Sequence, residues 1–173
     1  MNARKQLLLC TTVVGLALVI AGCPLVSAID AVEQLNKALI QQFYDDVWNA
    51  HDPDANANFF DHPNAVHHDP PAADYQPTAE QAVQRLEAAL MIVPDVVYTV
   101  HELIAKGDKV VARWTATGTH TGDINGVPAT GNTVTVSGTT IYRLSGGKIV
   151  ESWNAQDNLH LQEQFGAITI TNN

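Results

Sequence analysis

The apolar residues of this chain change their spacing at Pro94. Before Pro94 they recur three and four residues apart, which predicts amphipathic helices over residues 31–49 and from Thr78 onward. After it, apolar and polar residues alternate, which predicts strands over residues 96–105, 109–120, 133–143 and 148–156. Tight turns at 106–108 and 145–147 join successive strands, whereas a parallel pair needs a crossover of a dozen or more residues. We therefore expect an α+β domain with an antiparallel sheet.

Capping and turn signals set the limits of the remaining elements. Thr78 and Gln81 form a capping-box pattern at the start of the second helix, and Pro94 ends that helix. Residues 51–77 are rich in Asp, Asn and Pro, which predicts a long loop with one short helical turn near residues 56–60. A last short helix is predicted over residues 158–165.

The first 28 residues have the pattern of an export signal. Arg4 and Lys5 precede an apolar run over residues 7–20, which is shorter than the roughly 20 apolar residues of a membrane span. Residues 20–23, Ile-Ala-Gly-Cys, are typical of a bacterial lipobox, in which Cys23 becomes the lipidated first residue. The alternative is ordinary cleavage after Ala28.

These two cleavage sites lead to two predicted locations. Cleavage before Cys23 gives a cell-envelope lipoprotein, held to a membrane in the periplasm or at the cell surface by its lipid. Cleavage after Ala28 gives a secreted protein. We therefore divide the chain into an export signal, residues 1–28, and one folded domain, residues 29–173.

The net charge and the cysteine content limit the classes of partner and of chemistry. Cleavage before Cys23 leaves 173 − 22 = 151 residues and removes Arg4 and Lys5, so the formal charge goes from −9 to −11. This charge argues against nucleic acid as a partner and favours a small, neutral or cationic one. Cys10 leaves with the signal, so the folded part has no disulfide and no thiol chemistry.

Strand alternation over residues 148–156 groups side chains of mixed character. Strict alternation places Ile149, Glu151, Trp153 and Asp157 on one face. Because an unpaired buried charge is costly, two acids beside a Trp suggest that this face lines a cavity. The alternative is that the same face looks outward.

Several segments in the second half carry a resemblance to the SnoaL-like polyketide cyclases, also called ester cyclases, of the nuclear transport factor 2-like superfamily. These segments are residues 107–114, 118–122 (Gly-Thr-His-Thr-Gly), 126–131, 141–143 and 147–153, with Asp157 and Leu159. The resemblance implies a cone-shaped α+β barrel, in which a curved antiparallel sheet wraps N-terminal helices around a deep apolar pocket. It also implies ring closure by intramolecular aldol condensation, with an Asp as acid and base, no metal, no cofactor, and a homodimer.

Three polar residues are candidates for the chemistry, Asp157 and His68 from the resemblance and His120 from its place on a predicted strand. Asp157 matches the family's acid–base Asp, although it also stands where a helix N-cap is expected. His120 is a candidate donor to a substrate oxygen, with a simple turn residue as the alternative. His68, within Val-His-His-Asp-Pro, matches a position that borders the family's pocket, and its alternative is a loop histidine.

The other candidate residues are aromatic or acidic. Trp114, Trp153 and Tyr142 would form a flat apolar slot for a polycyclic or aromatic ligand, or simply part of the core. Glu151 would share protons with Asp157, or pair with Arg113 across the sheet.

A cluster of histidines and acids raises the question of a metal site. Its members are His51, Asp61, His62, His67, His68 and Asp69. Their spacing follows no standard ligand pattern, so solvated loop residues are the favoured interpretation and no metal is expected.

Together these observations predict an exported protein that binds a small apolar or aromatic molecule and acts on it by aldol-type acid–base chemistry through Asp157. Two alternatives stay open. One is a non-catalytic ligand-binding lipoprotein with the same fold, and the other is a related isomerase or epoxide hydrolase.

Overall fold

The computed structural model of this protein describes residues 28–69, 73–124 and 126–168. The chain divides into two compact units after Ala31, and the unit that begins at Val32 holds every described strand. The predicted export signal and its Cys23 lie outside the described residues. Within the described ranges, no helix has the length and apolar character needed to cross a membrane.

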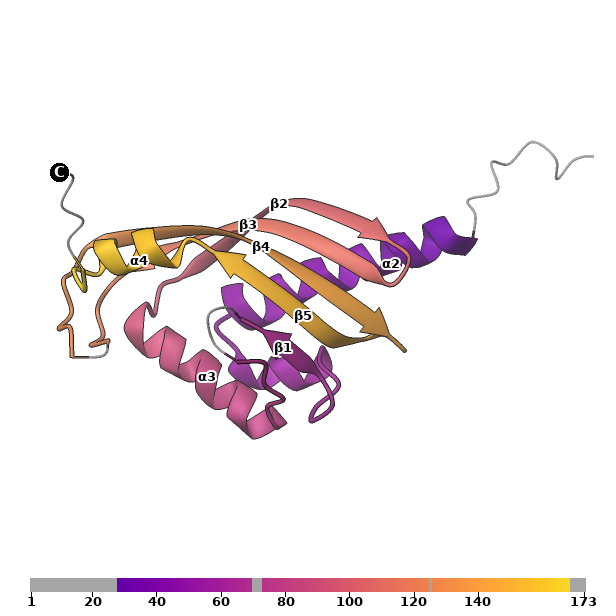
Figure 1. The fold of residues 1–173 in the computed structure, drawn as a ribbon, viewed down its shortest axis with the longest axis horizontal. Helices are drawn as coiled ribbons and strands as arrows, with labels where there is room; N and C mark the ends of the chain where they lie inside the picture. Colours follow the sequence, from indigo (N-terminus) through magenta and orange to yellow (C-terminus); the bar gives the residue numbers. More distant parts are fainter. Residues whose placement is uncertain (1–27, 70–72, 125, 169–173) are drawn as a thin grey trace, which may run out of the picture. The chain divides into compact units, whose positions relative to one another are not determined.

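Four long strands form most of a curved sheet (Figure 1). They are β2 (Val97–Lys106), β3 (Lys109–Thr119), β4 (Thr133–Ser145) and β5 (Lys148–Gln156), and successive strands pair antiparallel. The predicted strands are confirmed to within two residues at each end. The α+β class is confirmed as well.

A fifth strand, β1 (Val66–His68), extends the sheet to the order β1-β5-β4-β3-β2. It pairs in parallel with β5, with His67 opposite Ser152. The prediction of a long loop over residues 51–77 is therefore wrong at these three residues, and the sheet is not wholly antiparallel. A strand of three residues is too short to show an alternating pattern, and its partner lies far along the chain.

The first helix is longer and more complex than its apolar stripe predicts. Helix α2 (Ala28–Phe43) continues into a π-helical segment, η2 (Tyr44–Asn49). Val32 and Leu35, two members of the predicted stripe, are exposed. Because a π-helical turn holds more residues than an α-helical one, Tyr44 as well as Phe43 turns to the core.

The second helix begins as predicted. In α3 (Ala79–Ile92) the Thr78 Oγ1 accepts from the Gln81 amide at 3.2 Å, and the Gln81 Oε1 accepts from the Thr78 amide at 2.9 Å. The predicted turn near residues 56–60 corresponds to a 3-10 helix, η3 (Pro53–Asn58). The last helix, α4 (Asn158–Gln164), is also confirmed.

A β-bulge in β5 decides which side chains face the core. Leu144 pairs with Ile149 and Arg143 pairs with Glu151, so Val150 has no partner in the register. The extra residue interrupts the two-residue alternation. Ile149 is fully buried on the concave face, but Glu151 points with Arg143 to the outer face. The prediction is therefore wrong for Ile149, whereas Glu151 and Trp153 do share a face, and that face looks outward as the alternative held.

Candidate active site

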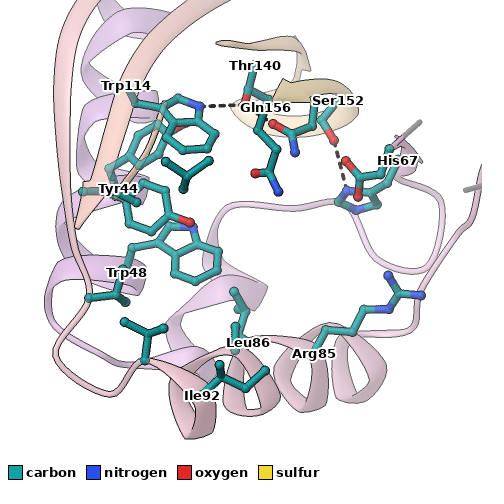
Figure 2. Close-up of a pocket in the computed structure, with 18 of the residues that line it drawn as sticks. Tyr44, Trp48, His67, Arg85, Leu86, Ile92, Trp114, Thr140, Ser152 and Gln156 are labelled. Carbon is teal, nitrogen blue, oxygen red and sulfur yellow. Dashed lines mark hydrogen bonds between the residues drawn. The ribbon is translucent and has the colours of Figure 1, made fainter. Parts of the chain in front are cut away.

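A cavity of about 440 Å³ lies between the concave face of the sheet and the helices. Figure 2 shows Tyr44, Trp48 and Trp114 along one side, with Ser152 and His67 on the opposite side. Leu86 and Ile92, on the face of α3 that lines the cavity, add an apolar floor. The cavity thus has an aromatic side and a polar side, which suits a flat ligand with one polar edge.

The aromatic side is a packed series of rings. The Tyr98 ring centroid lies 4.7 Å from that of Trp48, 5.2 Å from that of Trp114 and 5.6 Å from that of Tyr44. Burial raises the pKa of Tyr44, Tyr98 and Tyr142, so all three phenols are neutral at physiological pH. Aromatic rings packed in this way supply large, rigid apolar area.

Hydrogen bonds connect the aromatic side to β4 and β5. Trp114 Nε1 donates to Thr140 Oγ1 at 3.0 Å, and the Thr140 hydroxyl donates to Asn154 Oδ1 at 2.9 Å. The hydroxyls of Tyr44 and Tyr142 share a hydrogen bond of 2.9 Å. All of these residues line the cavity, so this network is part of its wall.

His67 is the histidine that lines the cavity. Its Nδ1 lies 3.0 Å from Ser152 Oγ, and its Nε2 is buried with no hydrogen-bond partner among the described residues. Its ring stacks on Phe60 at 5.0 Å and on Tyr75 at 5.1 Å. Burial lowers the pKa of His67 to about 4, so the imidazole is neutral at physiological pH.

Charged groups in the cavity lining gather near His67. Tyr75 donates its hydroxyl hydrogen to Asp69 Oδ2 at 2.7 Å, and the Arg85 guanidinium carbon lies 3.9 Å from the centre of the Tyr75 ring. Burial, followed by the bond to Asp69, raises the pKa of Tyr75 to about 12. Asp69 and Arg85 place opposite charges in this part of the lining.

The structure places only two of the predicted site residues, Trp114 and Tyr142, in the lining of this cavity. Asp157, a predicted catalytic residue, is the N-cap of α4, where its Oδ1 accepts from the His160 amide at 3.1 Å. Asp157 is exposed and does not line the cavity, so the geometry matches the capping alternative.

His120, the other predicted catalytic residue, is completely buried at the end of β3. Its Nδ1 lies 3.0 Å from Thr130 Oγ1, and its ring centroid lies 4.6 Å from that of Phe165. Phe165 lines the cavity, whereas His120 does not. Its Nε2 has no hydrogen-bond partner in the described part of the chain.

The remaining predicted residues, His68, Glu151 and Trp153, form a cluster on the outer face of the sheet. His68 stacks on Trp153 at 5.1 Å with an interplanar angle of 6°. Its Nε2 lies 3.0 Å from Glu151 Oε1 and its Nδ1 lies 2.8 Å from Asp74 Oδ1. None of the three predicted residues lines the cavity.

Glu151 has a different partner from the one considered in the sequence. Arg143 Nε donates to its Oε2 at 2.7 Å, whereas Arg113 Nε lies 3.5 Å from Glu102 Oε2. The expectation of an Arg113 pair is therefore wrong, because the register places Arg113 opposite Glu102 and Arg143 opposite Glu151. The bonds from Arg143 and His68 lower the pKa of Glu151, and those to Glu151 and Asp74 raise the pKa of His68.

Sequence reasoning missed the polar side chains that do face the cavity. They include His67 on β1, the charged Asp69 and Arg85, and Ser152, Asn154 and Gln156 on β5. The prediction chose the face of β5 that carries carboxylates, but the face of β5 that lines the cavity carries neutral groups. The Val-His-His-Asp-Pro segment contained a usable signal, because the two histidines of a strand must point to opposite faces.

The other histidines of the suggested metal cluster have protein partners. His51 Nε2 lies 2.8 Å from the Val96 carbonyl, and the two ring nitrogens of His62 lie 3.0 Å from the Pro77 carbonyl and 2.9 Å from Asn56 Oδ1. Among the residues that the structure describes, no three His, Cys, Asp or Glu side chains are arranged to hold a metal ion.

Comparison with known proteins identifies the class. The sequence profile of the SnoaL-like polyketide cyclases matches residues 38–165, and the chain belongs to this family. No curated protein gives a significant match. Many solved structures do, and they confirm the nuclear transport factor 2-like fold of the SnoaL-like cyclases.

Three solved structures illustrate the similarity. AclR of Streptomyces galilaeus, described as a candidate hydroxylase, is 27% identical with a TM-score of 0.69, covering 79% of this chain and 99% of AclR. A candidate polyketide cyclase of Acidithiobacillus ferrooxidans is 28% identical, with a TM-score of 0.68 and coverage of 78% and 96%. A SnoaL-like protein of Jannaschia, at 23% identity, shares the fold with a TM-score of 0.71 and coverage of 83% and 97%.

Proposed function

We propose that this protein binds a small, flat, apolar or aromatic molecule in the cavity and acts on it by acid–base chemistry that needs no cofactor. The family supports small apolar ligands. The names of its relatives include both a cyclase and a hydroxylase, so family membership alone does not select the reaction. The observation that carries the proposal is a buried imidazole, with one unused ring nitrogen, facing an aromatic wall.

In this proposal His67 takes the acid–base role. When its Nδ1–H donates to Ser152 Oγ, its Nε2 carries an unshared lone pair. Nε2 is buried, so this role requires the wall around His67 to open to the ligand. That lone pair accepts the proton from a carbon next to a carbonyl of the ligand. The electron pair of the broken C–H bond forms the C=C bond of an enolate, and the π pair of the carbonyl moves onto its oxygen. The neutral state of His67 keeps the lone pair available at physiological pH.

Asp157 remains the alternative base that the family resemblance suggests. It is exposed at the start of α4, so this role would require it to reach the ligand from outside the cavity lining. Turnover of a confirmed substrate by His67→Gln and Asp157→Asn variants separates the two bases. Loss only in His67→Gln supports our proposal, and loss only in Asp157→Asn would transfer the role to Asp157.

Filling the cavity tests ligand binding without knowledge of the substrate. Ala89 lines the cavity on α3, whereas its neighbour Ala88 is exposed and lines only an adjoining surface groove. Binding of the bicyclic hydrocarbon tetralin can be followed by fluorescence, because Trp48 and Trp114 line the cavity. We expect Ala89→Phe to reduce affinity at least tenfold and Ala88→Phe to leave it unchanged. Equal affinities of the two variants would contradict the proposed binding site.

A non-catalytic ligand-binding protein is the second candidate, and the neutral side chains of β5 favour it. Ser152, Asn154 and Gln156 can orient a ligand but are not acids or bases at physiological pH. This candidate predicts equal ligand affinity in the wild type and in His67→Gln, with no chemical change in any ligand recovered from the protein.

Export, lipidation and dimer formation are further proposals, supported only by the sequence and the family resemblance. Labelled palmitate incorporated by the wild type but not by Cys23→Ser would support the lipid anchor, and a label in both would contradict it. Sedimentation equilibrium of the folded domain measures whether it is a dimer.

A further inference from the structure

We propose that Tyr44, Tyr142 and Asn154 form a subsite that binds a carbonyl oxygen of the ligand. The three residues line the cavity. The hydroxyls of Tyr44 and Tyr142 share a hydrogen bond, and Asn154 Oδ1 accepts from Thr140, which itself accepts from Trp114. This inference rests on the proposed function, because it concerns the same cavity and names the chemical class of its ligand.

In the structure the Asn154 amide is oriented with its Oδ1 toward Thr140. Trp114 Nε1 can only donate, so the Thr140 oxygen accepts from it and the Thr140 hydrogen is free to donate to Asn154 Oδ1. The amide nitrogen of Asn154 then has two hydrogens and no hydrogen-bond partner among the described residues. It is not sealed from solvent either, so it is a free donor in the cavity wall.

The tyrosine pair adds a second donor. Two phenol groups have two hydrogens, and their shared 2.9 Å bond uses one of them. The other hydrogen can turn to Thr140, which lies close to both phenols, or to a ligand oxygen in the cavity. Because both phenols are neutral, this hydrogen is present at physiological pH.

The free donors of Asn154 and of the tyrosine pair favour a ligand whose polar group is a hydrogen-bond acceptor. Asn154 Oδ1 and Thr140 Oγ1 already accept from protein groups, so the hydrogen of a ligand hydroxyl would find poor partners there. A carbonyl oxygen has two lone pairs and no hydrogen, which matches donors from the amide and the phenol. The packed rings of Tyr44, Tyr98 and Trp114 beside these donors favour a flat aryl ketone over a flexible one.

The position of the subsite also fits the proposed chemistry. Asn154 follows Ser152 by two residues on the cavity face of β5, which separates their Cα atoms by about 7 Å. Ser152 is the partner of His67. A carbonyl held by Asn154 can therefore direct a neighbouring carbon toward His67, and the same donors stabilise negative charge on the oxygen when the proton leaves.

The test compares 1-tetralone with tetralin, a ketone and the hydrocarbon of the same ring system, by tryptophan fluorescence. A net gain of about one hydrogen bond predicts that the wild type binds tetralone about tenfold more tightly than tetralin. Tyr142→Phe and Asn154→Leu should each reduce this ratio severalfold. Thr115→Val is the control, since it also removes a hydroxyl but Thr115 does not line the cavity, and its ratio should not change.

The infrared band of carbonyl-13C tetralone gives a second readout that does not depend on variants folding normally. Bound to the wild type, the carbonyl stretch should move to lower frequency than in an apolar solvent, because hydrogen bonds weaken the C=O bond. Equal affinity for tetralone and tetralin with an unshifted band would overturn the subsite and leave ligand binding intact. If neither probe binds, both the subsite and the proposed function are wrong.

Discussion

His67 and His68 are neighbours in the chain, yet they lie in opposite environments. His67 faces the cavity, where burial lowers its pKa to about 4 and leaves Nε2 without a partner in the described residues. His68 faces outward, where Glu151 and Asp74 accept from its ring and raise its pKa. A single step along β1 thus separates a side chain whose neutral form is stabilised from one whose charged form is stabilised.

The same contrast runs along β5. Its cavity side carries Ser152 and Asn154, which are neutral, and its outer side carries Glu151, which pairs with Arg143 and His68. Charged groups are stable on the outer face because water and opposite charges surround them. The cavity side can hold polar groups only where each finds a hydrogen-bond partner or a ligand.

The largest expected difference between the two faces concerns their tryptophans. Trp114 is buried and donates to Thr140, so Trp114→Ala should lower the free energy of unfolding by about 3–5 kcal/mol. Trp153 is half-buried beside His68 and Lys109, and Trp153→Ala should lower it by about 1 kcal/mol. Urea unfolding measures both, and equal losses would remove the distinction between the faces.

The two histidines should differ in proton affinity by more than a hundredfold. The imidazole resonances of His67 should titrate near pH 4, and those of His68 above the ordinary value of about 6.5. Two-dimensional NMR of the ring nitrogens measures both midpoints, with His67→Gln and His68→Gln used for assignment. A His67 midpoint near 6.5 would contradict its burial in the cavity wall.

The loss of stability in Glu151→Gln should depend on pH, because Glu151 and His68 on the outer face both titrate. The lowered pKa of Glu151 stabilises the fold above about pH 4.5 and the effect is lost as the pH falls through its folded pKa. The raised pKa of His68 stabilises the fold below about pH 6.5 and the effect is lost as the pH rises through its folded pKa. The variant should therefore be least stable relative to the wild type between about pH 4.5 and 6.5.

Because the Glu151 side chain is 20% exposed, solvent screens part of this effect. We expect a difference of about 0.5–1 kcal/mol in urea unfolding inside that pH window. Glu102→Gln is the matched control, since Glu102 pairs with Arg113 but has no histidine partner among the described residues. A Glu151→Gln difference that keeps growing above pH 7 would argue against the contribution of His68.

The smallest expected effect concerns Asp157. As the N-cap of α4 it should be replaceable by Asn, which caps equally well, whereas Asp157→Ala should lower the free energy of unfolding by about 0.5–1 kcal/mol. Thermal unfolding of both variants measures this. If Asp157→Asn keeps its stability but loses turnover, Asp157 has a chemical role that its position outside the cavity lining does not explain.

Local patterns predicted most elements of the fold. Thr78 and Gln81 cap α3 as expected, and the period of two gave the four long strands, because these signals depend on residues close together in the chain. The candidate site was predicted less well. Trp114 and Tyr142 were predicted correctly as lining residues. Asp157 and Glu151 were chosen in place of His67 and Asn154, because the sequence does not reveal the bulge at Val150.

The sequence by itself determined the fold class, the family and the presence of an apolar pocket, since these follow from local periodicity and from motifs that are continuous in the chain. Only the tertiary structure decided which histidine faces the pocket and which face of β5 lines it. Both depend on strand pairing: β1 pairs with β5 across a separation of 85 residues at His67 and Ser152, and one bulged residue reverses every later side chain.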